Sequence, residues 1–292
     1  MLPRSRWMTD LLAEYYALFH LRAFLQTRYE DQGTFNPISP RDWAAAVLGE
    51  HRPDLPSIPL TRTDLSAFCT SNADVLDCFL AVMAWGRQDA GKRGQARALN
   101  VWQRSQSGIR DRLEILRSEK PDRVAAFNLF SGSNEVSDLG VAYFTKLLYF
   151  FAPRTTQGAD RYILDKWTAR SVNLLAKKRL IHMSKAGDAV TRHNNAAIYD
   201  AYCTELEVLA AILNLHHLDA PLRAEDIELM LFASGGPGAA VRPWRHHVRV
   251  HWKTNAPSHR FSRDLVLTRA RAVRELLRVE SHNYLESECF SA

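Results

Sequence analysis

The chain has 292 residues, of which 46% are hydrophobic and 24% are charged. This length and composition exclude a peptide-sized module and a disordered chain, and they predict one large domain or two smaller lobes with hydrophobic cores. The formal net charge of +6 is a modest basic excess, which favours polyanionic partners without identifying one. No apolar run reaches the roughly 18 residues of a membrane span. Acidic residues also interrupt the first apolar helix, so we expect a cytoplasmic protein with no membrane partner.

The cysteines and histidines give no metal-binding pattern. The four cysteines are too scattered for a CxxC-type cluster and too few for a disulfide scaffold. The adjacent residues His246 and His247 are poorly placed to bind one metal ion. We therefore expect buried, reduced thiols, no metal and no cofactor. The cysteines are Cys69, Cys78, Cys203 and Cys289.

Hydrophobic periodicity predicts a mostly helical chain. Residues 11–25 carry apolar side chains at helical spacing, and a second helix is expected between Ser39 and Gly49, which are typical start and stop residues. A buried helix follows at residues 73–85 and stops at Gly86. Further helices are expected near residues 94–106, 108–118, 121–130, 141–151, 165–180, 195–215, 223–233 and 264–287.

One segment departs from the helical pattern. Apolar and cationic side chains alternate from Val248 to Lys253, which is typical of a β-strand and predicts a short hairpin arm. Because the rest of the pattern is helical, the predicted fold class is all-α.

Basic residues are concentrated in two segments. Between residues 87 and 110 six cations accompany the single acid Asp89, and between residues 242 and 260 five cations are interspersed with histidines and two tryptophans. Clustered cations with flat side chains between them suit a phosphate backbone and exposed bases. An ordinary solvated surface explains the composition equally well.

Lys146 is the most informative single residue. The surrounding stretch, residues 141–151, is apolar around nearly its whole circumference, so this helix should be buried. A buried ammonium group must be paired, reach water or lose its proton, and the neutral amine is a nucleophile. The alternative is a lysine that extends out of a helix end into solvent.

Asp165 follows Lys146 by nineteen residues and ends an apolar run, where it could cap the next helix. Between the expected helices 121–130 and 141–151 lies a hairpin of mostly small residues, which leaves backbone N–H groups free at the start of the second helix. These groups and the helix dipole suit a DNA phosphate.

Three sequence elements carry a resemblance to a known family. Leu139-Gly140-Val141 lies in the hairpin, Lys146 follows Thr145 on the next helix, and Asp165 ends the run that starts at Tyr162. In this order and spacing the chain resembles the helix-hairpin-helix superfamily of DNA glycosylases, and specifically its 8-oxoguanine glycosylase-like branch. The resemblance covers residues 125–175. It departs from the familiar Gly-Val-Gly hairpin at Ala142 and by the apparent insertion of Tyr143-Phe144.

The resemblance implies two helical lobes with a DNA-binding cleft between them. Residues 71–164 would form a central lobe with the helix-hairpin-helix motif at about 121–151, and residues 1–70 and 165–292 would form the second lobe. The implied partner is double-stranded DNA containing a modified base, bound by a monomer. The four-cysteine loop of some relatives is absent from the sequence, so no iron–sulfur cluster is implied.

The implied activity is base excision from DNA. Lys146 would attack C1′ of a flipped nucleotide, Asp165 would stabilise the positive charge on the sugar, and AP lyase activity could follow. The default base is 8-oxoguanine. Candidate DNA contacts are Leu139, Gly140, Val141, Ala142, Tyr143, Arg87, Gln88, Arg93 and Arg97. The candidate base pocket consists of Trp85, Phe144 and Trp167.

Purely structural roles for several of these residues, and two competing functions, stay open at this stage. Trp85 could belong to the core, Arg87 and Gln88 could be ordinary loop residues, and Asp165 could be only a cap. The protein could be a phage-defence glycosylase that excises a hypermodified base such as glucosylated hydroxymethylcytosine. It could also be a non-catalytic helix-hairpin-helix protein in which Lys146 has a structural role or contacts phosphate.

Overall fold

The structure is a computed structural model that describes residues 15–27, 38–86, 91–152, 160–177, 179–214, 221–232, 243–255 and 268. Within these residues the secondary structure is helical, which confirms the predicted all-α class. An isolated β-bridge joins Met183 to Val190. None of the described helices has both the length and the apolar character needed to cross a membrane.

The helices are α2 Leu18–Leu25, α3 Pro40–Leu48, α4 Arg62–Thr70, α5 Val75–Trp85, α6 Gly91–Ser118, α7 Arg123–Asn128, α8 Val141–Phe150, α9 Lys166–Leu175, α10 Ala196–Asn214, α11 Ala224–Phe232 and α12 Pro243–Asn255. A short 3-10 helix, η1, covers Gly132–Asn134 in the hairpin before α8. The helix expected at residues 264–287 lies outside the described residues except for Thr268.

Local sequence signals explain several helix ends. The Ser39 side chain accepts a hydrogen bond from the Asp42 N–H at the start of α3, and Gly49 ends that helix with φ of +71°. Both ends were predicted from the sequence. Helix α4 was not predicted, although Thr61 and Asp64 form a reciprocal capping box at its start.

The prediction of two helices at 94–106 and 108–118 is wrong, because α6 is one helix of 28 residues that continues through Gly108. A glycine inside a helix costs about 1 kcal/mol relative to alanine. The buried side chains of α6 continue on both sides of this glycine and offset that cost. They are Ala98, Val101, Trp102, Ile109, Leu113 and Leu116.

The predicted strand at Val248–Lys253 is also wrong, because these residues belong to α12. Trp244, Val248 and Trp252 are buried at spacings of four residues, which is one face of a helix. Arg249 and Val250 are both exposed on this helix, whereas Val248 is buried. The alternation of apolar and cationic residues therefore does not correspond to the two faces of a strand.

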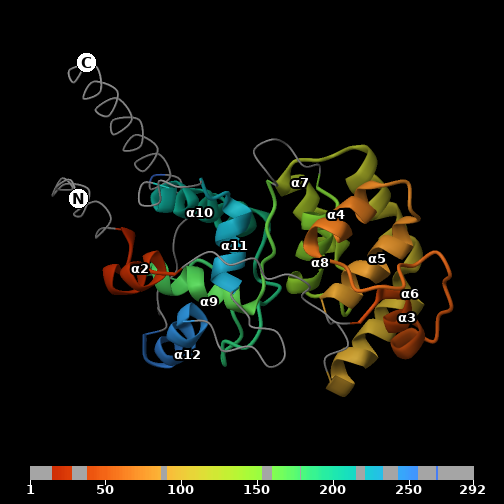
Figure 1. The fold of residues 1–292 in the computed structure, drawn as a ribbon, viewed down its shortest axis with the longest axis horizontal. Helices are drawn as coiled ribbons and strands as arrows, with labels where there is room; N and C mark the ends of the chain where they lie inside the picture. The colour runs from red at the N-terminus through yellow and green to blue at the C-terminus, as the bar shows by residue number, and fades with distance from the viewer. Residues whose placement is uncertain are drawn as a thin grey trace, which may run out of the picture.

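Figure 1 shows two groups of helices, with α3 to α8 on one side and α2 with α9 to α12 on the other. Helices α7 and α10 pack against each other between the groups. One continuous hydrophobic core takes side chains from both groups. Helices α3 and α4 pack on α5, in the group of helices that contains α8.

Candidate active site

The Lys146 side chain lies on α8 among buried side chains and is 8% exposed. Its Nζ donates a hydrogen bond of 2.6 Å to the carbonyl oxygen of Ala142, one turn earlier. The same Nζ lies 5.0 Å from the ring centre of Tyr143. The side chain therefore runs back along its own helix instead of extending into solvent.

The end of α5 closes over the hydrocarbon part of the Lys146 side chain. A Cβ atom placed on Gly86 would lie 2.9 Å from Lys146 Cδ and 3.0 Å from Cε. Only a residue without a side chain fits this contact without moving the lysine. Gly86 was predicted as a helix stop, and the structure gives it this second role.

Burial lowers the pKa of the Lys146 amine below its usual value. Asp165 and Glu228 oppose this shift because each favours the ammonium form, whereas the Arg62 guanidinium adds to it. The net direction is downward, so more of the amine is neutral at a given pH than in an exposed lysine.

Asp165 is the N-cap residue of α9. Its Oδ1 accepts hydrogen bonds from the backbone N–H groups of Trp167, at 2.7 Å, and Thr168, at 2.9 Å. The Thr168 hydroxyl accepts one in return from the Asp165 N–H at 3.0 Å. The carboxylate is thereby fixed in direction at a helix N-terminus, where negative charge is favoured.

A hydrogen bond joins the segment that carries Asp165 to the helix that carries Lys146. The Leu164 N–H donates to the Thr145 hydroxyl at 3.1 Å, between the immediate neighbours of the two residues. No direct ion pair within 4.0 Å connects Lys146 and Asp165, both of which the structure describes. Asp165 acts on the Lys146 amine through its electric field, which favours the ammonium form.

The hairpin before α8 presents its backbone at Gly140, which is the N-cap residue and has no side chain to cap the helix. A Cβ on Gly140 would meet no atom within 4 Å, and its φ of −72° is open to any residue. Leu139 and Val141 are each 2% exposed, so their side chains belong to the core. Ala142 and Tyr143 are partly exposed.

Residues 29–232 match the protein family described as "Putative 8-oxoguanine DNA glycosylase OGG-like protein". The matched segment contains the hairpin, α8 and Asp165. The chain belongs to this OGG-like family. Searches of curated proteins and of solved structures found no match.

Two charged residues of this OGG-like protein complete the surroundings of the lysine, and sequence reasoning missed both. Glu228 on α11 is 1% exposed, and its carboxylate forms an ion pair with Arg62 of α4. The Arg62 guanidinium lies 4.5 Å from the ring centre of Tyr149 and 5.7 Å from that of Trp85. Tyr149 lies one turn after Lys146 on α8, so Arg62 links Glu228 to the lysine helix.

Burial raises the pKa of Glu228 to about 7, and Asp165 adds to this shift, even though Arg62 and Lys146 favour the ionised form. Arg62 Nε and Nη1 are buried without a hydrogen-bond partner among the described residues. The site therefore contains two cations and two acids, of which Lys146 and Glu228 are buried and Asp165 and Arg62 are partly buried.

A sequence signal for Glu228 existed. It lies between Ile227 and Leu231, both buried on α11, so it interrupts an apolar stripe as Lys146 does. No spacing rule connects residue 62 with residue 228, however, because only the tertiary fold brings α4 and α11 together.

The three predicted base-pocket residues lie in different surroundings in the structure. Trp85 lies beside Arg62, and Trp167 follows Asp165 at the start of α9. Phe144 is 3% exposed and packs in the core, with its ring centre 4.9 Å from that of Phe127 and 5.7 Å from that of Phe130. This position makes Phe144 a core residue rather than the wall of an open pocket.

The structure describes only some of the DNA contacts that were predicted between residues 87 and 97. Arg87 and Gln88 lie outside the described residues, as does the side chain of Arg93, whose backbone belongs to α6. Arg97 is exposed on α6.

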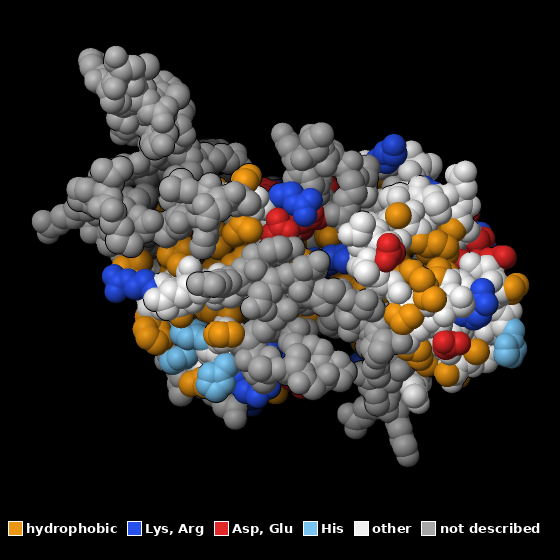
Figure 2. Space-filling view, viewed as in Figure 1, with side chains coloured by type: hydrophobic (Ala, Val, Ile, Leu, Met, Phe, Trp, Pro, Cys, Tyr) orange, Lys and Arg blue, Asp and Glu red, His pale blue; other side chains and the backbone are white. Residues whose placement is uncertain are grey.

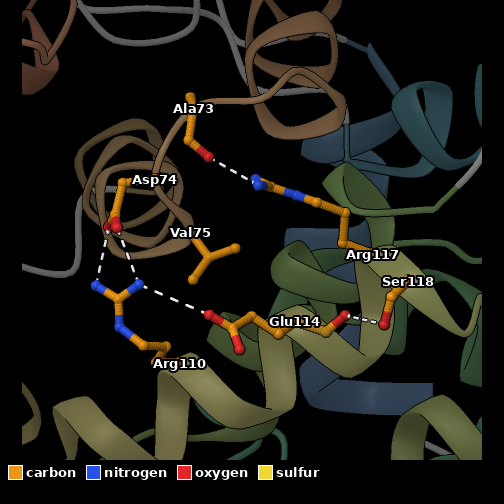
Figure 3. Close-up of a pocket in the computed structure, with 7 residues that line it drawn as sticks. All are labelled: Ala73, Asp74, Val75, Arg110, Glu114, Arg117 and Ser118. Atoms are coloured by element: carbon orange, nitrogen blue, oxygen red, sulfur yellow. Dashed lines mark hydrogen bonds and ion pairs between the residues drawn. The ribbon is translucent and has the colours of Figure 1, made fainter.

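A surface hollow of about 420 Å³ lies elsewhere, where the start of α5 faces α6 (Figure 3). Its charged groups already have partners, since Asp74 pairs with Arg110 at 2.9 Å and Arg117 donates to the Ala73 carbonyl at 2.7 Å. Among the described residues, no group of three or more His, Cys, Asp or Glu side chains is placed to hold a metal ion. Cys69, Cys78 and Cys203 are free and buried.

Proposed function

We propose that this protein is a DNA glycosylase that excises a modified base, by default 8-oxoguanine, from double-stranded DNA and then cleaves the strand as an AP lyase. Lys146 is the nucleophile and Asp165 the electrostatic partner. The observation that supports this most is the hydrogen bond between Leu164 and Thr145, which sets a buried lysine beside a fixed carboxylate. Membership of the OGG-like family supports the substrate class.

The reaction begins with the target nucleotide flipped out of the stack, because C1′ is inaccessible inside a duplex. The neutral Lys146 amine attacks C1′, the Nζ–C1′ bond forms, and the glycosidic bond breaks. The base leaves with the bonding electrons and takes up a proton. The nitrogen then loses a proton, the C1′–O4′ bond opens, O4′ is protonated and a Schiff base remains. Removal of a C2′ proton expels the 3′ phosphate by β-elimination.

Asp165 faces a sugar that becomes positively charged as the base departs. A carboxylate held by two backbone N–H groups does not need to reorient when this charge develops, which is the condition for electrostatic stabilisation. These bonds use Oδ1, so within the described residues Oδ2 is not engaged in hydrogen bonding.

Glu228 receives the proton that Lys146 must lose before it attacks. Transfer from Lys146 to Glu228 changes a cluster of two cations and two anions into one of each, so no net charge is added to a buried site. The raised pKa of Glu228, about 7, makes it able to hold this proton near neutral pH.

Borohydride trapping tests the proposal, because only a Schiff base between enzyme and DNA is reduced to a stable covalent adduct. The wild-type chain should be trapped on a duplex with an 8-oxoguanine or an abasic site. Lys146→Ala and Lys146→Gln should not be trapped, whereas Lys185→Ala, which removes an exposed lysine, should behave as wild type. Equal trapping of wild type and Lys146→Ala would rule out the assigned nucleophile. DNA binding without any trapping would favour a non-catalytic DNA-binding protein.

A further inference from the structure

Helix α12, Pro243–Asn255, lies beyond the segment that matches the OGG-like family, yet it packs on α9, the helix that begins at Asp165. The Trp244 indole N–H donates to the Ser171 hydroxyl of α9 at 3.0 Å. The buried side chains of Trp244, Val248 and Trp252 form the contact face of α12. This packing fixes which side chains of α12 lie next to the start of α9.

Three cations surround the Trp167 indole where these two helices meet. The Arg245 guanidinium of α12 lies 3.9 Å from the ring centre, and Lys166 and Arg170 of α9 each lie 5.2 Å from it. The Arg170 guanidinium is also 5.5 Å from the ring of Trp252. We call Lys166, Trp167, Arg170 and Arg245 the cationic platform.

The loop that contains Gly187 holds the Arg170 side chain of the platform in place. Arg170 Nε donates to the Gly187 carbonyl at 2.8 Å, which orients the guanidinium. Gly187 has φ of +69°, and a Cβ there would overlap the Trp252 indole, so glycine is required for this close approach. The cations are therefore arranged by α9, α12 and this loop together rather than spread as independent surface charges.

The platform gathers more positive charge than its neighbours neutralise. Among the described residues, none of its three cations forms an ion pair within 4.0 Å. The facing carboxylates are Asp165, which caps α9, and Asp188, which accepts a hydrogen bond from Ser184. Burial lowers the pKa of Lys166, and Arg170 and Arg245 lower it further, although Asp165 and Asp188 oppose them. A bound anion would relieve this repulsion.

Figure 2 shows histidine side chains together with Lys or Arg side chains on the part of the surface where Figure 1 places α12. We propose that the cationic platform binds the phosphodiester backbone of duplex DNA next to Asp165, and that α12 thereby extends the DNA contacts beyond the family segment. Several Lys and Arg side chains gathered beside flat indole faces suit a phosphodiester backbone, because the backbone of DNA is contacted mainly by such cations. The choice of DNA as the polyanion rests on the proposed function.

The test is the salt dependence of affinity for an undamaged DNA duplex, because each phosphate contact contributes about one unit to the slope of log K against log salt. Arg245→Gln should reduce the slope by about 1, and the double variant Arg245→Gln/Lys166→Gln by about 2. Arg22→Gln, which removes an exposed arginine of α2, should leave it unchanged. Arg245→Lys should keep the wild-type slope, because it keeps the charge.

Binding to undamaged duplex needs no catalysis, so the platform and the glycosylase can fail separately. If the folded Arg245→Gln and double variants are trapped at wild-type levels and keep the wild-type slope, the platform proposal is overturned and the glycosylase proposal stands. A reduced slope in a protein that is never trapped would support the platform and remove the glycosylase. A slope change with an RNA duplex and none with DNA would overturn the proposal.

Discussion

At the residue scale, the candidate site depends on a buried lysine whose surroundings include a buried carboxylate, a partly buried carboxylate and a partly buried guanidinium. Desolvation alone would leave any buried lysine partly neutral. We propose Glu228, whose pKa is raised to about 7, as the acceptor of the lysine proton inside the site.

Glu228→Gln should therefore slow Schiff-base formation by about 10²-fold at neutral pH, because general-base catalysis contributes at least that much. The wild-type rate should rise as pH increases through about 7, where Glu228 ionises and becomes able to accept the proton. That inflection should be absent from the variant. Single-turnover trapping rates between pH 5.5 and 8.5 give the profile.

The matched control is Glu225→Gln, which changes another buried glutamate of α11 that pairs with Arg223. It should keep the wild-type pH profile. If Glu228→Gln retained both the rate and the inflection, Glu228 would be only the structural partner of Arg62.

Gly86→Ala should displace the Lys146 side chain with little cost to the fold. The new Cβ would lie 2.9 Å from a flexible side chain, and the φ of −77° suits alanine. We expect a change in unfolding free energy of about 1 kcal/mol or less but a loss of about 10²-fold in trapping rate, as for a misplacement of about 1 Å. Thermal melting and trapping on the same preparation give both values, and unchanged trapping in this variant would contradict the contact.

At the element scale, the N-termini of α8 and α9 differ in how they are capped. Helix α9 is capped by Asp165 through two amides, whereas α8 begins at a glycine that offers no cap. A helix N-terminus without a side-chain cap keeps N–H groups available to an external anion.

Asp165→Asn should separate capping from chemistry, since an amide oxygen can still accept both hydrogen bonds. Stability should fall by no more than about 1 kcal/mol, while excision should fall by about 10²-fold or more because the charge is lost. Asp122→Asn at the cap of α7 makes the same change away from the site and should leave excision intact. Full excision by a folded Asp165→Asn protein would reduce Asp165 to a cap.

Gly140→Ala should weaken DNA binding while leaving stability within about 0.5 kcal/mol of wild type, because the added methyl group meets nothing inside the protein. Gly49→Ala is the contrasting control. Its φ of +71° makes alanine cost about 1–2 kcal/mol, and DNA affinity should not change. Equal DNA affinity for Gly140→Ala and wild type would remove the hairpin as a phosphate contact.

Element prediction succeeded where one periodicity dominated, and it failed in α12, where two overlapped. The Ser39 and Gly49 signals gave both ends of α3, and the apolar run around Lys146 gave α8. In α12 the helical spacing of Trp244, Val248 and Trp252 was hidden by a six-residue alternation within it. The burial of those three side chains against α9 decides between the two patterns, and it is a tertiary property.

At the scale of the whole molecule, the site is assembled from distant parts of the chain. Lys146 and Asp165 could be proposed from the sequence because they are close in sequence and both lie in the segment that resembles the family. Arg62, Gly86 and Glu228 come from α4, the end of α5 and α11, so their meeting depends on packing between helices that no local pattern specifies. The two-lobe division and the DNA cleft remain predictions.

The central claim is that Lys146 forms the covalent bond to DNA. The most direct measurement is mass spectrometry of proteolytic peptides after borohydride trapping of the wild-type chain on a duplex with one 8-oxoguanine. We predict one modified peptide, with the deoxyribose remnant on Lys146. A remnant on Lys166 or on any other amine, in a protein that is trapped efficiently, would contradict the account.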